Sequence, residues 1–427
     1  MLYWQRAGHQ ASDRSANLEA IQHLTMGLQL LATLPETPTR AQQELEFQLA
    51  LGPAFMALKG FAASEVEQTY ARAWVLCQQV GGTLQLFPTL WGLYRSYLTR
   101  GALPKARELG EQLVRLAQRE AAPTPRLEAY EALGTVLFHM GEYTAAWKYL
   151  KQGITLIEPA MQQAQTLHHG EAPGMRCLAV ATLTLWCLGY PAQAVPRCQE
   201  ALALAQALAH PHSLAAARYW AILLHYRRRE ISAAQAQADA LLTLATEHEF
   251  SLMVGHGTFW RGWARAMQGQ REVGLIQMHQ GLTAIVTTGQ TVTRPLYLVL
   301  LAELAGHAGQ VEEGLRLLAE ALIAIEESGR GEVLAEAYRC QGELLLRHAT
   351  PDTAQAATCF QRALGIARHQ QAKSWELRAA ISLARLWQRQ DKRQQAYDLL
   401  APVYGWFTEG FDTADLQEAE AILGELA

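Results

Sequence analysis

The sequence predicts an all-α fold, a superhelical solenoid of about ten helix hairpins closed by a C-terminal capping helix. Three observations predict it. Small residues recur at a spacing of about 40 residues, and glycine stands five positions before most of them. In addition, no segment keeps a period-2 alternation of β-branched residues. Together they favour a protein built from repeated helical units without a sheet.

The repeat is clearest in the segment 127–159, LEAYEALGTVLFHMGEYTAAWKYLKQGITLIEP. Counting Leu127 as position 1, small residues fall at positions 8 and 20, where they let the two helices of a hairpin approach closely. Position 20 recurs along the chain at intervals of 40, 48, 40, 40, 40, 42 and 40 residues. The residues are Ala106, Ala146, Ala194, Ala234, Gly274, Gly314, Ala356 and Ala396.

Position 15 predicts where the first helix of each hairpin ends. Glycine suits this position because it alone adopts the left-handed helix-end conformation at little cost. The matches are Gly101, Gly141, Gly189, Gly269 and Gly309, with Arg229 and Asp391 as weaker ones. These seven positions predict seven sharp turns between helices.

The register divides the chain into one continuous solenoid. The expected units are 1–35, 44–82, 86–120, 126–159, 174–210, 213–249, 254–289, 294–329, 334–371 and 376–408. The 48-residue interval predicts an insertion at 160–173. A final helix, 413–426, is expected to begin at Thr413, with acidic residues near its positive end, and to cover the last apolar surface.

Composition limits the class of protein. The 427 residues carry 36 Lys+Arg against 40 Asp+Glu, which argues against a nucleic-acid partner held by a global basic field. Six irregularly spaced cysteines argue against a disulfide framework and favour a reducing, cytoplasmic location. The uncharged run 177–196 is interrupted by Gly189-Tyr190-Pro191, so we expect a buried helix there and no membrane span.

Several segments carry a resemblance to a known family. They are YWQRAG at 3–8, the segment 14–52, VEQTYARAWVLCQQVG at 66–81, and 383–419 with its ending WFTEGFDTADL. The chain resembles the right-handed tetratricopeptide (TPR) array in the C-terminal half of large bacterial signalling proteins. In that family a class III adenylate/guanylate cyclase domain or another effector precedes an ATPase of the AAA/NACHT-like type. The resemblance implies a sensory or regulatory array, although ordinary TPR units repeat every 34 residues rather than 40.

This chain departs from that family in two respects. It contains no Gly-Lys pair, so it has no phosphate-binding loop of the GxxxxGK[ST] kind, and no cyclase segment is recognisable. Neither nucleotide hydrolysis nor cyclisation is therefore assigned to it, and we expect no enzymatic activity and no cofactor. In a loop where the family tends to carry Gly-x-Asp-Pro-Gly, this chain has Gly170-Glu171-Ala172-Pro173-Gly174, so the aspartate is replaced by Ala172.

The family's rule for groove-lining positions, applied to this register, selects candidate binding residues. They are Trp91, Arg95, Phe138, His139, Trp186, Tyr219, Tyr226, Arg227, His256, Phe259, Trp260 and Trp263. The same rule selects Glu128, Glu131, Arg176, Arg339, Glu343 and Arg347. Aromatic residues and arginine dominate binding energy at interfaces, which favours a concave peptide or protein groove. The alternative is that these aromatic side chains fill the larger interior of a 40-residue repeat.

Other polar clusters are open to two interpretations. Arg227-Arg228-Arg229 is either a solvated helix end or a contact for phosphate or an acidic peptide. His168-His169 and His210 with His212 are either loop residues or metal ligands, and their spacing favours loop residues, so no metal site is assigned.

The sequence therefore predicts a non-catalytic interaction or scaffolding module that binds a protein segment or an attached ATPase domain. The alternative is a small-molecule sensor. A protein groove predicts a long open channel, whereas a sensor predicts a closed aromatic pocket of a few hundred Å³.

Overall fold

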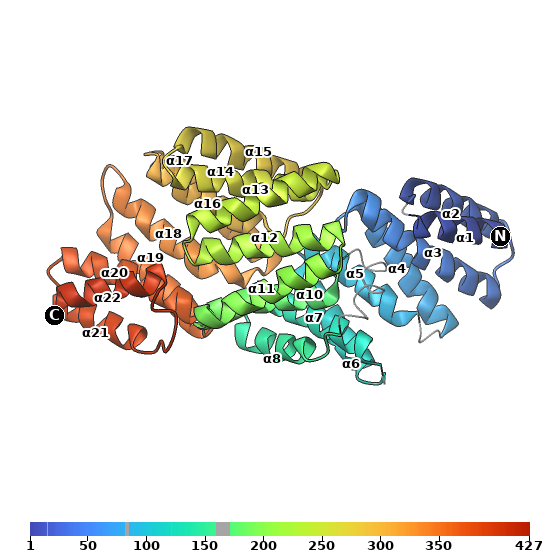
Figure 1. The fold of residues 1–427 in the computed structure, drawn as a ribbon, viewed down its shortest axis with the longest axis horizontal. Helices are drawn as coiled ribbons and strands as arrows, with labels where there is room; N and C mark the ends of the chain where they lie inside the picture. The colour runs from blue at the N-terminus through green and yellow to red at the C-terminus, as the bar shows by residue number, and fades with distance from the viewer. Residues whose placement is uncertain (15, 82–84, 121, 159–170) are drawn as a thin grey trace.

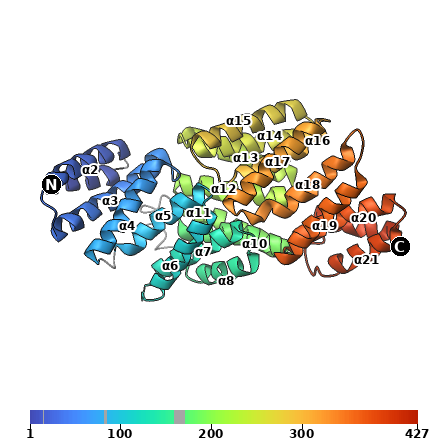
Figure 2. The same cartoon turned by 180° about the vertical axis from the view of Figure 1, so that it is seen from behind.

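The computed structural model describes residues 1–14, 16–81, 85–120, 122–158 and 171–427. Within these ranges the chain is helical and contains no strand, which confirms the predicted all-α solenoid of helix hairpins. The two termini lie at opposite ends of an elongated array, and the hairpins α12–α17 stack to one side of the long axis (Figures 1 and 2). The helices are α1 (Leu2–Asp13), α2 (Asn17–Ala32), α3 (Pro38–Lys59), α4 (Ser64–Val80), α5 (Leu86–Thr99), α6 (Leu103–Ala117), α7 (Pro123–His139), α8 (Tyr143–Ile154), α10 (Pro173–Leu188), α11 (Pro191–Ala207), α12 (Pro211–Arg227), α13 (Ile231–Glu247), α14 (Ser251–Met267), α15 (Arg271–Thr287), α16 (Arg294–His307), α17 (Val311–Ser328), the 3₁₀ turn η1 (Gly331–Val333), α18 (Leu334–Arg347), α19 (Thr353–His369), α20 (Lys373–Arg389), α21 (Arg393–Tyr404) and α22 (Ala414–Leu426).

The small residues at position 20 lie where helices touch. All eight are buried. At Gly274 in α15, an added Cβ would stand 2.6 Å from both the Cβ of Ala266 and the carbonyl oxygen of Gly262 in α14. Separations under 3 Å are not tolerated by real Cβ atoms, so the backbones of α14 and α15 approach as closely as glycine allows. The small residues at position 20 therefore mark the places where two helices are in close contact.

The predicted turn positions adopt the left-handed conformation. The five glycines at position 15 have φ between 71° and 98°. The two weaker matches behave in the same way, with φ of 62° at Arg229 and 58° at Asp391. Side chains other than glycine are strained in this region by about 1 kcal/mol. The turn geometry is thus retained even where the sequence does not supply the residue that suits it.

Successive turns of the superhelix touch one another. The backbone N–H groups of Thr291 and Val292 both donate to the carbonyl oxygen of Thr99, at 3.1 and 3.2 Å. Further along, the Ser374 hydroxyl donates to the carbonyl oxygen of Trp186 at 2.5 Å, across 188 residues. The helices α10 and α20 also pack against each other. One turn therefore takes about five of the 40-residue units, and the seam between turns is closed by direct contact.

The C-terminal helix packs against the last hairpin of the array. The helix α22 begins at Ala414, and it buries Leu416, Ala419, Ile422 and Leu426. Thr413 occupies the N-cap position, but its hydroxyl donates to the carbonyl oxygen of Gly410 at 2.7 Å and does not cap the helix. The predicted closing helix is present, whereas the predicted Thr413 cap is wrong, because the hydroxyl points towards Gly410 as a donor and its oxygen accepts no N–H group of the first turn.

The insertion predicted at 160–173 and the boundaries of the ten units are compared with the structure only in part. The expected insertion at 160–173 lies almost wholly outside the described residues, which resume at Glu171. The division into ten units stays a prediction. No helix in the described part of the chain combines the length and apolar character that crossing a membrane requires.

Candidate functional site

A cavity of about 1170 Å³ lies inside the array, between its N-terminal hairpins and its middle turn. One wall is the C-terminal half of α3 with the loop that follows it, including Met56 and Phe61. A second wall is formed by α12 and α14, and the remaining lining residues come from α1, α2, α5, α7, α10 and η1 and from the loops that precede α10, α12, α14, α16 and η1. Exposed residues such as Ala57 and Glu249 line it as well, so the cavity reaches solvent at that edge. Its walls thus come from units far apart in the sequence.

A buried charge cluster lines one side of the cavity. The Arg95 Nη2 donates to the Glu171 carboxylate at 3.1 Å, and the Arg176 Nη1 donates to the same oxygen at 3.0 Å. The Arg176 Nε donates to Glu131 at 2.7 Å. Burial opposes ionisation of Glu171, but the guanidinium groups of Arg176 and Arg95 outweigh it and lower its pKa to about 2. The negative charges of Glu131 and Glu171 therefore equal the positive charges of Arg95 and Arg176 in this cluster.

A second cluster is centred on Glu332, in the turn η1. The Arg330 Nη2 donates to Glu332 Oε1 at 2.7 Å, and the Arg227 Nη2 lies 3.4 Å from the same oxygen. The His139 Nδ1 is 2.6 Å from Glu332 Oε2, so His139 carries its proton there because a carboxylate can only accept. Burial lowers the pKa of His139, which keeps the ring neutral. Burial opposes ionisation of Glu332, yet Arg330 and His139 hold its pKa well below the usual range.

The aromatic part of the wall is a packed set of rings. The ring of Tyr219 lies 4.4 Å from that of His256, measured between centroids. The Tyr297 hydroxyl accepts from the Trp260 Nε1 at 3.0 Å and shares a hydrogen bond of 2.7 Å with His256 Nδ1. Burial lowers the pKa of His256 to about 3. The ring of His256 is thus neutral and held in place by its hydrogen bond with Tyr297.

The structure brings together five of the twelve residues predicted for the groove. Those that line the cavity are Arg95, Phe138, His139, Tyr219 and His256. The other seven are buried and are not among its lining residues: Trp91, Trp186, Tyr226, Arg227, Phe259, Trp260 and Trp263. Phe259, Trp260 and Trp263 are covered by the neighbouring hairpins, where they pack against Tyr226 and Tyr297. Contact between turns covers others. Trp186, for example, packs edge-on against Trp375 of the next turn, with ring centroids 4.8 Å apart.

The three consecutive arginines bind acidic groups of the chain itself. Arg227 faces Glu332 in the interior. Arg228 lies 3.2 Å from the carboxylate of Asp412, and Arg229 pairs with Asp415 and Glu418 of α22. Arg227 and Arg228 are buried, so the solvated helix end does not describe them, and a contact with an external phosphate or acidic peptide stays a prediction. Asp412, Asp415 and Glu418 belong to the C-terminal segment of the same molecule.

Three residues of the site were missed from the sequence. Glu171, Arg330 and Glu332 lie outside the hairpin positions to which the groove rule applies. Each is no more than 6% exposed, which is unusual for charged residues. The one signal in the sequence is at Glu171, which stands beside the position where the resembling family tends to carry an aspartate. Nothing in one sequence marks Arg330 or Glu332 as buried.

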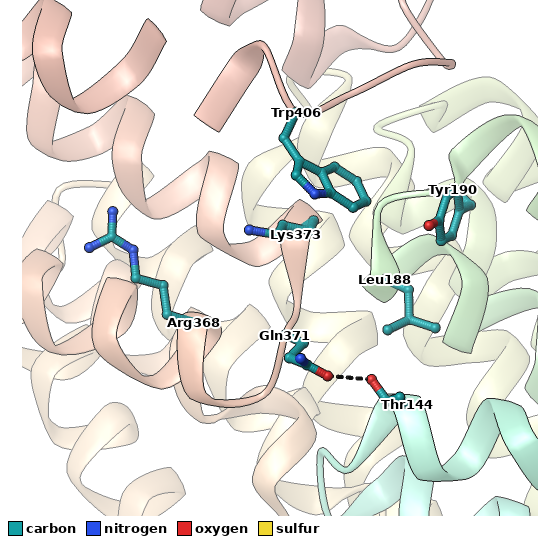
Figure 3. A pocket seen from close by; sticks show the side chains of 7 residues that line it. All are labelled: Thr144, Leu188, Tyr190, Arg368, Gln371, Lys373 and Trp406. Carbon is teal, nitrogen blue, oxygen red and sulfur yellow. Dashed lines mark hydrogen bonds between the residues drawn. The ribbon is translucent and has the colours of Figure 1, made fainter. Parts of the chain in front are cut away.

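A smaller pocket of about 380 Å³ lies at the seam between turns (Figure 3). On one side the Thr144 hydroxyl donates to Gln371 at 2.6 Å. On the other side Trp406 covers Gly189, and the Lys373 ammonium lies 5.4 Å from the centre of its ring. The segment WFTEGFDTADL thus has a structural role, because it joins one turn of the superhelix to the next.

The histidines and cysteines that the structure describes form neither a metal-ligand cluster nor a disulfide. No group of three or more potential metal ligands occurs within the described ranges. The His210 Nδ1 accepts the backbone N–H of Ser213 and so caps α12, while His168 and His169 lie outside those ranges. All six cysteines are buried and unpaired by disulfides.

Comparison with known proteins places the fold. No family model matches the chain. An uncharacterised protein of Rhizobium meliloti is 25% identical over 383 residues, which cover 89% of this chain. The chain spans 37% of that protein's length.

Among solved structures, a Rap protein complexed with Competence and Sporulation Factor matches with a TM-score of 0.63 at 13% identity, over 87% of this chain and 99% of its own. The apo form of RapI matches with a TM-score of 0.51 at 10% identity, over 66% and 96%. The human IFIT1 dimer with m7Gppp-AAAA matches with a TM-score of 0.50 at 14% identity, over 98% and 88%. At these identities the likeness is one of fold, and that fold is a TPR-like helical repeat array.

Proposed function

We propose that this chain is a non-catalytic binding module that takes a short peptide, or a segment of another protein, into its interior cavity. The observation that carries the proposal is the cavity itself, whose walls come from α3 on one side and from α12 and α14 on the other. A ligand in this position would contact units separated by more than 150 residues. Its binding would therefore bias how the N-terminal hairpins sit on the middle turn.

The size of the cavity favours a peptide over a metabolite. Small-molecule sites usually occupy about 300–1000 Å³, and this cavity, at about 1170 Å³, exceeds that range. Its lining alternates apolar stretches with buried charged groups, as a chain of mixed side chains would require. The Rap neighbour, solved in complex with a factor, supports the proposal by analogy of fold.

A small-molecule sensor is the second candidate. The packed rings of Tyr219, Trp220 and Phe138 favour it, because they form a rigid aromatic surface beside the polar ring of His256. The neighbouring IFIT1 structure, which holds m7Gppp-AAAA, makes a nucleotide or short RNA a third ligand to test.

The context that best fits the module is a longer signalling protein. The support is the resemblance to the arrays that follow AAA/NACHT-like ATPases and the greater length of the Rhizobium meliloti relative. In such a protein the array would regulate an attached ATPase domain, which would be its second partner.

The test is retention of a library of short random peptides by the purified chain, read by mass spectrometry. Ala57 is exposed on α3 and lines the cavity. Ala57→Trp should therefore narrow the entrance and lower retention by about tenfold or more, which corresponds to about 1.4 kcal/mol. Ala236 on α13 is equally exposed but away from the cavity, so Ala236→Trp is the matched control and should bind as the original chain does.

Three results would contradict the proposal. The first is that the chain retains no peptide. The second is that Ala57→Trp and Ala236→Trp retain the same peptides equally. The third is that nucleotides or metabolites bind in the cavity and peptides do not, which would favour the second or third candidate.

A further inference from the structure

The cluster around Glu332 carries more positive than negative charge. Two guanidinium groups, those of Arg227 and Arg330, face the single carboxylate of Glu332. His139, the third neighbour of that carboxylate, is neutral, so the cluster has a surplus of one positive charge. The cluster of Arg95, Arg176, Glu131 and Glu171 has no such surplus, although it is equally buried.

The surplus coincides with four hydrogen-bond donors that have no acceptor, whereas within the described part of the chain the cluster around Glu171 has one, the Nε of Arg95. Among the described residues, the Nε and Nη1 of Arg330 and the Nε and Nη1 of Arg227 have no hydrogen-bond partner. Both side chains are no more than 2% exposed. Buried donors without acceptors are rare, and a buried charge without a partner is costly. An anion that completes this cluster would remove both costs.

Arg330 is the residue through which such an anion can be reached. It lines the cavity together with His139, Tyr219, Thr293 and Glu332, whereas Arg227 lies behind them.

We propose that the cavity binds its peptide through a carboxylate group that lies against Arg330. This inference rests on the proposed function and adds the chemical group that is recognised. A carboxylate fits better than a phosphate because it brings one negative charge, which equals the surplus. A dianion would place excess negative charge beside Glu332 and Glu171. Guanidinium–carboxylate pairs with two parallel hydrogen bonds are also the strongest that a buried arginine forms with a monoanion.

The carboxylate can come from the peptide's C-terminus or from an aspartate or glutamate side chain. Three peptide libraries separate the two sources: one with a free C-terminus and no acidic residue, one amidated without acidic residues, and one amidated with acidic residues. We expect the chain to retain the first or the third at least about tenfold better than the second. The better retained of the two identifies the source.

Variants of Arg330 test the contact itself. Arg330→Gln should abolish the preference for a carboxylate, and it should leave the melting temperature of the free protein unchanged or higher, because it removes the surplus charge. Arg330→Lys keeps the charge and should keep the preference. Arg316→Gln, which changes an arginine that is mostly exposed, is the control and should behave as the original chain does.

The outcomes distinguish the two proposals. Retention of the amidated, acid-free library equal to that of the others, with Ala57→Trp still blocking retention, overturns the carboxylate inference and leaves the binding module standing. The same holds if Arg330→Gln keeps the preference or lowers the melting temperature, or if inorganic phosphate competes through Arg330 better than acetate. Failure of all three libraries to bind contradicts the proposed function itself.

Discussion

His256 gives the stability of the protein a dependence on pH. In the folded chain its pKa is lowered to about 3, whereas the unfolded chain has the ordinary value of 6.5. Between these values the unfolded state binds more protons, so the free energy of unfolding falls as pH is lowered from 6.5 towards 3. His139, whose pKa is lowered as well, acts in the same direction.

His256→Asn should weaken this dependence. The asparagine amide can replace Nδ1 in the hydrogen bond with Tyr297, but it does not titrate. Between about pH 7 and about pH 5, we expect the variant to lose about 2 kcal/mol less than the original chain, as measured by urea unfolding. The window stays above the range in which carboxylates titrate. His279→Asn at an exposed position is the control, and equal pH slopes for the three proteins would show that His256 is not buried as a neutral ring.

At the scale of residues, the sequence predicts the chemical types of the cavity-lining side chains better than it predicts which positions line the cavity. Arg95, Phe138, His139, Tyr219 and His256 were selected by a positional rule and line the cavity. Trp260 and Trp263 were selected by the same rule and are buried among Tyr226 and Tyr297. The rule describes a single hairpin, whereas burial here also depends on large side chains of neighbouring hairpins and, for Trp186, on Trp375 of the next turn. A residue's distance to a chain segment about five units away leaves no periodic mark in the sequence.

At the scale of elements, the turn after α11 offers a clean test of backbone strain. Ala209 is exposed and has a φ of 49°, in the left-handed region. Ala209→Gly should relieve this strain and raise the free energy of unfolding by about 0.5–1 kcal/mol. The result is measured by thermal or urea unfolding of the whole chain.

The matched control lies in the same segment. Ala203 is exposed inside α11. A glycine there relieves no strain and loses more conformational entropy on folding than alanine does. Ala203→Gly should therefore destabilise the chain by about 0.5–1 kcal/mol. The two Ala→Gly changes should have opposite signs, and destabilisation by both would contradict the left-handed turn at Ala209.

The elements were largely predictable because hairpin geometry is local. Small residues such as Ala146 and Gly274 mark close helix contact, and glycines such as Gly141 mark turns. These constraints act within about 20 residues, so they recur with the repeat. The cap of α22 was not predictable to the same degree, since the Thr413 hydroxyl can either accept from the first turn of the helix or donate to the preceding loop, and the sequence does not decide between them.

At the scale of the whole molecule, the C-terminal segment should stabilise the seam. The carboxylate of Glu409 accepts from the backbone N–H groups of Ala192 and Gln193, at 2.9 and 3.0 Å, at the start of α11. It therefore caps a helix that lies more than 200 residues earlier in the chain. Glu409→Ala should cost about 1 kcal/mol locally.

Hydrogen exchange is the measurement that suits this change. In Glu409→Ala we expect faster exchange at the amides of Ala192 and Gln193 and in the segment 405–413, while α1–α4 keep their rates. Glu409→Gln retains an acceptor oxygen and should show a smaller effect. Unchanged exchange at the start of α11 would mean that Glu409 does not hold the two turns together.

The closed seam also constrains how many repeats the protein can carry. In an open array each unit touches only its neighbours, so a hairpin can be duplicated or lost while the rest keeps its contacts. Here Ser374 must face Trp186, and the loop before α16 must reach Thr99. Adding or deleting one hairpin between these points would slide every such pair out of register at once. The repeat number in this part of the chain is therefore expected to be fixed during evolution, even while the residues within each repeat diverge.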